Sequence, residues 1–170
     1  GSVKMTSIFG APLIEVNPQI MPAWQFSAKR AFDILFSAFA LALLSPVFIL
    51  FALLVKFSSP GPVIFRQQRI GKFGKPFQIK KFRTMYTDAE QNGPQLSSRT
   101  DPRITPIGRW LRRTRMDELP QFWNVLVGDM SLVGPRPLPT AYLDRYTPAE
   151  ARRHDVRPGL TGWAQTNGRN

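Results

Sequence analysis

The chain has 170 residues, and its 23 Lys and Arg against 11 Asp and Glu give a net charge of +12 at pH 7. This length suits one domain with a modest core, and the positive charge predicts a negatively charged partner: nucleic acid, anionic lipid or a phosphorylated substrate. Cysteine is absent and His154 is the single histidine, which excludes disulfides, thiolate zinc sites, cysteine nucleophiles and multi-histidine metal sites.

The first segment, residues 1–28, is expected to be an N-terminal linker. Gly1-Ser2 has the composition of a tag remnant. Prolines interrupt the segment, and Ile14 with Val16 predicts a short strand between them.

A long apolar segment follows. Residues 34–55 contain 22 residues without a charge, about the length that crosses the core of a bilayer. A buried core helix is the alternative, but a domain this small could hardly enclose a helix that is apolar on every side. We therefore predict a membrane helix over residues 29–57. Asp33 at its boundary requires a partner, and Arg30 or Lys29 is expected to supply one.

The membrane helix is expected to break at Pro46, which follows Ser45. Proline lacks the N–H group, and its ring clashes with the carbonyl of Ala42. Basic residues flank both ends of the apolar segment, which favours both ends on the cytoplasmic side. A re-entrant helix satisfies the break and the flanking charges together, and a simple kinked span remains the open alternative.

Short elements are predicted beyond the apolar segment. A turn at residues 58–62 leads into a β-hairpin with strands near 63–70 and 77–82. Residues 87–105 read as a flexible polar surface loop. An Arg-rich amphipathic helix is expected from Ile107, a second from near Pro120 to Gly128, and a third over about 148–154. Residues 157–170 are expected to form a loop.

The predicted fold class is α+β and mainly helical. It combines a membrane helix broken at proline, either re-entrant or a kinked span, with a small β-hairpin and surface amphipathic helices. Residues 58–170 would form a domain on the cytoplasmic face of the membrane.

The adjacent carboxylates Asp117 and Glu118 are the first candidates for chemistry. Three arginines, Arg112, Arg113 and Arg115, lie within five residues and are expected to keep Asp117 ionised. An ionised Asp can attack phosphorus, and the repulsion between two anions then requires Arg or Mg²⁺. Paired carboxylates suit Mg²⁺. The alternative is that Asp117 simply caps a helix.

Basic residues elsewhere are candidate phosphate ligands. Lys81 and Arg83 would share one face of a strand, although a solvated strand edge explains them as well. Arg136 lies between two prolines in a rigid turn, and Arg157 and Arg169 lie in Gly-rich segments. The alternative for each of these arginines is a solvated side chain without a ligand.

Taken in order, the motifs resemble those of the bacterial sugar transferase family, which are monotopic polyprenyl-phosphate phosphoglycosyl transferases. The resemblance runs from Lys29 to Asn170 and rests on seven motifs: Lys29-Arg30-x-x-Asp33, Ser45-Pro46, Ser59-Pro60-Gly61-Pro62, Lys81-Phe82-Arg83-Thr84-Met85, Asp117-Glu118-Leu119-Pro120-Gln121, Gly134-Pro135-Arg136-Pro137 and Arg157-Pro158-Gly159-x-Thr161-Gly162.

The resemblance implies transfer of a sugar 1-phosphate from a UDP-sugar to undecaprenyl phosphate, with release of UMP. Such a reaction starts bacterial glycan or exopolysaccharide assembly at the inner (cytoplasmic) membrane. It also implies an aspartyl phospho-sugar intermediate on Asp117, a Mg²⁺ cofactor, and Glu118 as support for the metal or for proton handling. The re-entrant form of the helix and a possible homodimer are implied as well.

The resemblance further implies substrate binding by six basic residues: Lys81, Arg83, Arg112, Arg136, Arg157 and Arg169. Family members usually continue beyond an end like Asn170, so the catalytic domain is expected to be truncated here and to belong to a larger member. The competing hypothesis is a membrane-anchored basic module that binds anionic lipid or nucleic acid without catalysis. The apolar segment argues against nucleic acid, and no motif names the sugar.

Overall fold

A computed structural model describes residues 4–8, 11–15, 22–89 and 101–167 of the chain. The chain divides into two compact units, Gly1–Phe32 and Asp33–Asn170. In the first unit, strands β1 (Lys4–Ile8) and β2 (Ala11–Glu15) pair antiparallel, with Lys4 opposite Glu15. The strand predicted at Ile14 is confirmed, whereas Val16 lies outside the described residues.

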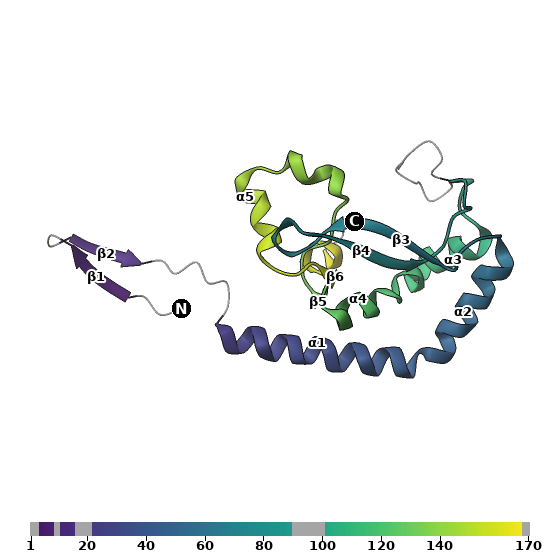
Figure 1. Ribbon diagram of the computed structural model, residues 1–170, viewed down its shortest axis with the longest axis horizontal. Helices are drawn as coiled ribbons and strands as arrows, with labels where there is room; N and C mark the ends of the chain where they lie inside the picture. Colours follow the sequence, from purple (N-terminus) through teal and green to yellow (C-terminus); the bar gives the residue numbers. More distant parts are fainter. Residues whose placement is uncertain (1–3, 9–10, 16–21, 90–100, 168–170) are drawn as a thin grey trace. The chain divides into compact units, whose positions relative to one another are not determined.

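Two consecutive helices, α1 (Ala23–Leu43) and α2 (Ser45–Ser58), carry the apolar segment (Figure 1). They meet at a bend of 63°. Pro46 lies in the first turn of α2, so the predicted break is confirmed where the missing N–H and the ring of proline interrupt the helix. The first helix begins at Ala23, earlier than expected, because no further helix breaker follows Pro22 before the bend.

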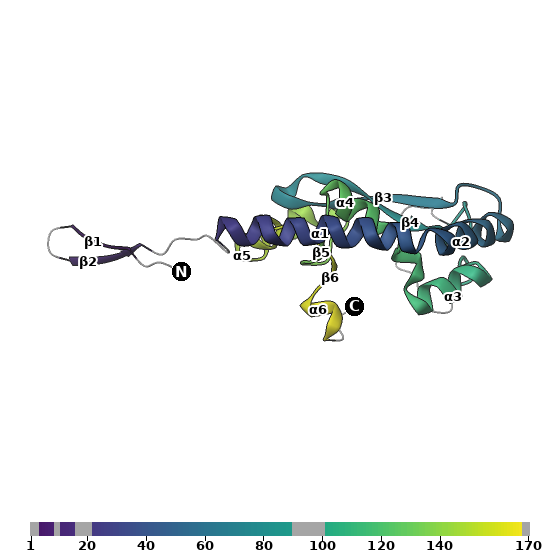
Figure 2. The same cartoon turned by 90° about the horizontal axis from the view of Figure 1, so that it is seen from below.

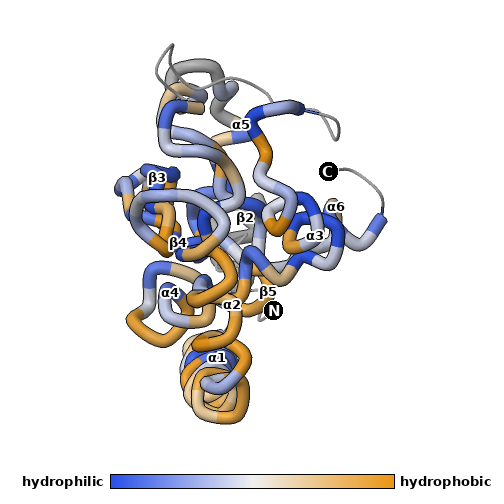
Figure 3. Tube along the Cα trace, turned by 90° about the vertical axis from the view of Figure 1, so that its right-hand side faces the viewer, coloured by the Kyte–Doolittle hydropathy of each residue, from blue (hydrophilic) through white to orange (hydrophobic). Residues whose placement is uncertain are grey.

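The hydropathy of the bent pair is high along most of its length (Figure 3). Within the described residues, neither helix is by itself long and apolar enough to cross a membrane. Taken together, α1 and α2 reach the length and composition that a broken span or a re-entrant loop requires.

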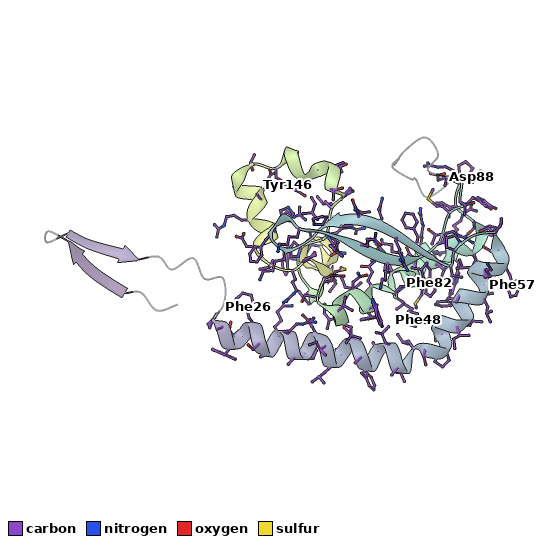
Figure 4. The ribbon with its side chains drawn as sticks, in the orientation of Figure 1. Phe26, Phe48, Phe57, Phe82, Asp88 and Tyr146 are labelled. Carbon is purple, nitrogen blue, oxygen red and sulfur yellow. The ribbon has the colours of Figure 1, made fainter. Side chains whose placement is uncertain are left out.

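Strands β3 (Ile64–Ile70) and β4 (Pro76–Phe82) form the predicted antiparallel hairpin, with Ile64 opposite Phe82 and Ile70 opposite Pro76. The core lies where β4 meets α2 and α3 (Pro106–Thr114), and Phe51, Phe82 and Leu111 are buried there. The ring centroids of Phe48 and Phe82 are 5.8 Å apart (Figure 4). The apolar face of α2 therefore anchors the hairpin.

Helix α3 is capped at Thr105, whose Oγ1 accepts a hydrogen bond of 3.0 Å from Gly108 N. Glycine is required at position 108, because a Cβ atom there would collide with the backbone carbonyl of Thr84. This close approach places α3 directly against the chain that leaves β4. The predicted amphipathic helix is thus confirmed, with Leu111 buried and Arg109 exposed.

Helix α4 (Gln121–Val127) lies between the hairpin and α1 (Figures 1 and 3). Its Phe122 ring is 6.1 Å from the ring of Phe36. On the opposite side, Asn124 Oδ1 accepts from Lys80 N at 3.0 Å and its Nδ2 donates to Gln78 O at 2.8 Å. Gly128 ends the helix in a left-handed conformation, as predicted.

The buried Asp33 of α1 has a partner that its position in the sequence did not indicate. Its Oδ1 accepts a hydrogen bond of 3.1 Å from Leu132 N. This bond joins the apolar helix to the chain after α4. The pairing expected with Arg30 or Lys29 stays a prediction.

Two loop predictions need correction. Residues 157–170 contain strand β6 (Gly159–Thr161), which pairs parallel with β5 (Ser131–Val133), and helix α6 (Trp163–Thr166) (Figure 2). Three-residue strands are too short to show an alternating pattern. The 87–105 segment is not wholly a surface loop, because Ile104 and Thr105 are buried; its residues 90–100 lie outside the described part.

The last predicted helix is confirmed in a modified form. The structure has a 3₁₀ turn over Thr140–Arg145, an α-helical turn α5 (Pro148–Ala151) and a further 3₁₀ turn over Arg152–Asp155. A capping box between Thr147 and Glu150 starts α5.

Candidate functional site

The adjacent carboxylates lie in a 3₁₀ turn, Met116–Glu118, that connects α3 to α4. Arg115 ends α3 in a left-handed conformation with φ 61° and so redirects the chain. Helix α4 starts after Pro120 without a side-chain cap. The interpretation of Asp117 as a cap of α4 is therefore wrong, and its carboxylate is buried in the connection instead.

Glu118 forms an ion pair with a residue from the hairpin. Lys81 Nζ lies 2.7 Å from Glu118 Oε1. Burial by itself would raise the pKa of Glu118, but the charge and hydrogen bond of Lys81, helped by Arg136, hold that pKa below its ordinary value. Lys81 thus keeps Glu118 ionised and fixes its orientation.

Asp117 behaves differently although it is the next residue. Its exposed fraction is 8%, and burial raises the pKa of Asp117 more than the charges of Lys81 and Arg112 lower it, while Glu118 adds to the increase. The sequence predicted that the neighbouring arginines keep Asp117 ionised, and it did not reveal the opposing effect of burial on the pKa. A desolvated carboxylate with a raised pKa is a more basic nucleophile than a solvated one.

Arg112 lies on the α3 side of the carboxylates. Its Nε donates a hydrogen bond of 2.8 Å to Thr84 Oγ1, a contact made possible by the close approach of α3 at Gly108. Burial lowers the pKa of Arg112, and the charges of Asp117 and Asp101 oppose that decrease. Asp101 and Thr84 lie beside the site, and the sequence did not indicate that either residue would be there.

Arg83 does not join the carboxylates. Its guanidinium is buried against the end of α2, where Nη2 donates to Ser59 O at 2.6 Å and to Ser59 Oγ at 3.0 Å. Its Nη1 donates to Pro60 O at 3.0 Å. Arg83 thus donates to the backbone carbonyls of Ser59 and Pro60, just after the end of α2. This geometry gives no support to the expected contact between Arg83 and a phosphate.

The three remaining predicted ligands are arginines, and the structure places one of them beside the carboxylates. Arg136 lines a small cavity together with Lys81 and Glu118. Arg157 donates from Nε to Gly128 O at 2.9 Å, which ties it to the end of α4. Arg169 lies outside the described residues, so its expected role stays a prediction.

Two cavities adjoin Glu118. The larger measures about 320 Å³, and it is lined by Arg115, Glu118, Leu119, Phe122, Leu160, Thr161, Gln165 and Thr166. The smaller measures about 30 Å³, and its lining includes Gln121 and Arg136. Glu118, Leu160 and Gln165 belong to both. Gln121 and Gln165 were missed from the sequence, although the position of Gln121 three residues after Glu118 could have indicated a shared face.

The residues present suit a divalent cation shared with a substrate. Over the described ranges, no cluster of three or more His, Asp or Glu side chains could hold a metal. Mg²⁺ is commonly bound through one or two carboxylates, waters and substrate phosphates rather than by a complete protein cage. Asp117 and Glu118 supply those two carboxylates, so the donor set fits Mg²⁺.

Comparison with known proteins adds an independent observation. A family model described as "Bacterial sugar transferase" matches residues 24–170. The chain is 46% identical over 169 residues to "UDP-glucose:undecaprenyl-phosphate glucose-1-phosphate transferase" of Escherichia coli K12, covering 98% of this chain and 35% of that protein.

Two further relatives have similar identities. The chain is 45% identical over 168 residues to "UDP-N-acetylgalactosamine-undecaprenyl-phosphate N-acetylgalactosaminephosphotransferase" of Aeromonas hydrophila, with 97% and 39% covered. It is 49% identical over 175 residues to "Undecaprenyl-phosphate glucose phosphotransferase" of Komagataeibacter xylinus, with 99% and 31% covered. The chain therefore spans between 31% and 39% of the length of these three relatives.

Proposed function

The chain belongs to the bacterial sugar transferase family, and on that premise we propose that it transfers a sugar 1-phosphate from a UDP-sugar to undecaprenyl phosphate. The observation that carries the proposal is the pair Asp117 and Glu118, held in one turn with opposite electrostatic surroundings and faced by Lys81, Arg112 and Arg136. The names of relatives at 45–49% identity support the substrates.

In the proposed first step, an Oδ atom of Asp117 attacks the phosphorus that carries the sugar. The Oδ–P bond forms as the bond from that phosphorus to the bridging oxygen breaks, and UMP leaves with the electron pair. In the second step, an oxygen of undecaprenyl phosphate attacks the same phosphorus and the P–Oδ bond breaks. The carboxylate is regenerated, and the product is an undecaprenyl diphosphate sugar.

The neighbouring residues would position the reacting groups. Arg112, whose Nε is bonded to Thr84, presents a guanidinium beside Asp117 that can hold a phosphate. Lys81 keeps Glu118 ionised and oriented. The cations also offset the repulsion between a carboxylate and a phosphate ester.

We propose Mg²⁺ as the cofactor, with Asp117 and Glu118 as its protein ligands. When bound, the cation supplies positive charge that offsets the negative charge of the phosphates. Lys81 already occupies Oε1 of Glu118, which leaves the other carboxylate oxygen for a metal.

The test compares UMP release by wild type and Asp117→Asn, with a UDP-sugar panel, polyprenyl phosphate and Mg²⁺, with and without a chelator. Asparagine keeps the size of the side chain and removes its negative oxygen, so we expect a loss of at least about 1000-fold. Asp155→Asn, in an exposed 3₁₀ turn, is the matched control. If Asp117→Asn released UMP at the wild-type rate, Asp117 would not be the nucleophile.

We also propose that α1 and α2 form a re-entrant helix in the bacterial inner membrane, with the catalytic residues on the cytoplasmic side. The bent pair has suitable length and composition, and its outward side chains are strongly apolar, with Phe57 84% exposed. Charged residues at both flanks favour one side for both ends.

This topology can be tested by cysteine labelling, because the chain has no native cysteine. Single cysteines replacing Lys29 and Lys56 should react with a membrane-impermeant reagent from the same side of inverted vesicles. Labelling from opposite sides would instead show a span.

The competing hypothesis of a non-catalytic basic module finds no support in the comparisons, because the relatives above are all named as transferases. Detection of UMP release would exclude a purely binding role.

A further inference from the structure

The small cavity beside Glu118 contains buried polar atoms that lack partners. Gln121 is 2% exposed, and its Nε2 has no hydrogen-bond partner among the described residues. Arg136 Nη1 is likewise buried, and no acceptor in the described part of the chain reaches it. Both residues line the same cavity of about 30 Å³.

Buried donors without acceptors destabilise a folded protein. The same helix shows that the fold can satisfy a buried amide, because Asn124 uses both its Oδ1 and its Nδ2 in hydrogen bonds. Gln165 lines the same cavity, and its buried Oε1 is an acceptor without a partner among the described residues. The two unsatisfied donors still outnumber this acceptor, which indicates a place for a further acceptor from outside the described part of the chain.

The charge of the cavity selects the kind of acceptor. Arg69, Lys81 and Arg136 line it against the single carboxylate of Glu118, and that carboxylate is already paired with Lys81. The excess of positive charge favours an anionic oxygen over a neutral carbonyl. A guanidinium and an amide N–H are the donors that bind phosphate oxygens well.

The size of the cavity sets how much of a ligand enters. About 30 Å³ leaves room for one or two water-sized groups, so the cavity can accept a phosphate oxygen and not a nucleotide or a sugar. The larger cavity of about 320 Å³ shares the walls formed by Glu118, Leu160 and Gln165. Its Leu119 and Phe122 offer apolar surface for the group attached to the phosphate.

We propose that Gln121 is a substrate-binding residue, whose Nε2 holds a non-bridging phosphate oxygen together with Nη1 of Arg136. The ligand is a phosphate ester whose remaining group occupies the larger cavity. Its source rests on the proposed function and is either the UDP-sugar or the polyprenyl phosphate.

The experiment measures binding to the full chain in detergent, with UDP as one probe and farnesyl phosphate as the other. Gln121→Met removes the donor while keeping the side-chain length, and Gln121→Glu replaces the donor by a negative oxygen. Gln68→Met, at an exposed position on β3, is the matched control. Calorimetric titration gives Kd, and the melting temperature without ligand reports folding.

We expect Gln121→Met to raise Kd about tenfold for the probe whose phosphate occupies the cavity, and Gln121→Glu to raise it further. The control should bind like wild type. Because Nε2 has no partner among the residues that the structure describes, the melting temperature of Gln121→Met should not fall, whereas loss of a purely structural side chain would lower it.

Each outcome has one meaning. If the Gln121 variants bind only UDP more weakly, the cavity holds a phosphate of the UDP-sugar. If they bind only farnesyl phosphate more weakly, it holds the phosphate of the polyprenyl lipid. Weaker binding of both probes indicates a phosphate position that the two substrates share. Unchanged binding of both probes, with wild type still releasing UMP, overturns this inference and leaves the proposed function standing. Failure of wild type to bind either probe overturns both.

Discussion

Two regions of the molecule bury polar side chains, and they differ in how far the buried donors are paired with acceptors. At the structural junction, formed by Arg83 with the end of α2 and by Asn124 with β4, Arg83 Nη1 and Nη2 and Asn124 Nδ2 find protein acceptors, although Arg83 Nε finds none among the described residues. At the small cavity, Gln121 Nε2 and Arg136 Nη1 find none within the described residues. Burial of a polar group therefore does not distinguish structure from function. The difference is that Gln121 and Arg136 line a cavity, whereas most of the donor groups of Arg83 and Asn124 are used within the protein.

The contrast is sharpest within single elements. Gln121 and Asn124 lie one turn apart on α4 and are 2% and 1% exposed. Lys81 and Arg83 are two residues apart on the chain through β4, and one pairs with Glu118 while the other binds backbone carbonyls. Residue type is nearly the same in each pair, and the difference comes from what the opposite element offers.

The largest effect is expected from Arg83→Met. The change removes a buried cation and leaves the carbonyls of Ser59 and Pro60 without donors, so we expect a loss of about 4 kcal/mol in the free energy of unfolding. Denaturant titration measures it, with Arg66→Met, at an exposed position, as control. If Arg83→Met had unchanged stability and a raised KM, Arg83 would be a substrate-binding residue and not a structural contact at the junction.

Asn124→Ala should have the next largest effect. It removes bonds to Gln78 O, Lys80 N and Asp129 Oδ2, and we expect a loss of about 3 kcal/mol by the same titration. Gln121→Met, one turn away, should cost little or nothing. Equal losses at the two positions would contradict the distinction between the junction and the cavity.

The smallest expected effects are opposite changes in melting temperature when Asp117 and Glu118 are replaced by their amides. Folding raises the pKa of Asp117, so its contribution to stability decreases as pH rises through that pKa, and Asp117→Asn should raise the melting temperature at pH 7.5. Folding lowers the pKa of Glu118, so its contribution is present at neutral pH and is lost as pH falls through the lowered pKa. Glu118→Gln should therefore lower the melting temperature at pH 7.5.

Melting scans at pH 7.5 and pH 3.5 measure both shifts. The gain from Asp117→Asn should shrink at pH 3.5, because aspartic acid there is protonated in the folded protein. A loss of stability from Asp117→Asn at both pH values would mean that the buried charge is fully compensated.

Several features follow from local sequence. Pro46 breaks the apolar helix because a proline inside a helix lacks the N–H group and its ring clashes with a preceding carbonyl. Gly128 ends α4 because glycine accepts a left-handed conformation. The hairpin and the Arg-rich helix show their own periodicity. The seven motifs, taken in order, indicate the family by residue type and order alone.

Other features depend on which elements meet. The direction of the pKa shift at Asp117 depends on burial, which no neighbouring residue in the chain reveals. The short parallel pair β5 and β6 forms because Ser131 meets Gly159 across 28 residues of chain. Gln121 and Arg83 could each be a ligand or a structural contact by sequence. Only the acceptors placed opposite them by the tertiary structure decide between the two, because a hydrogen bond requires a partner at a fixed distance.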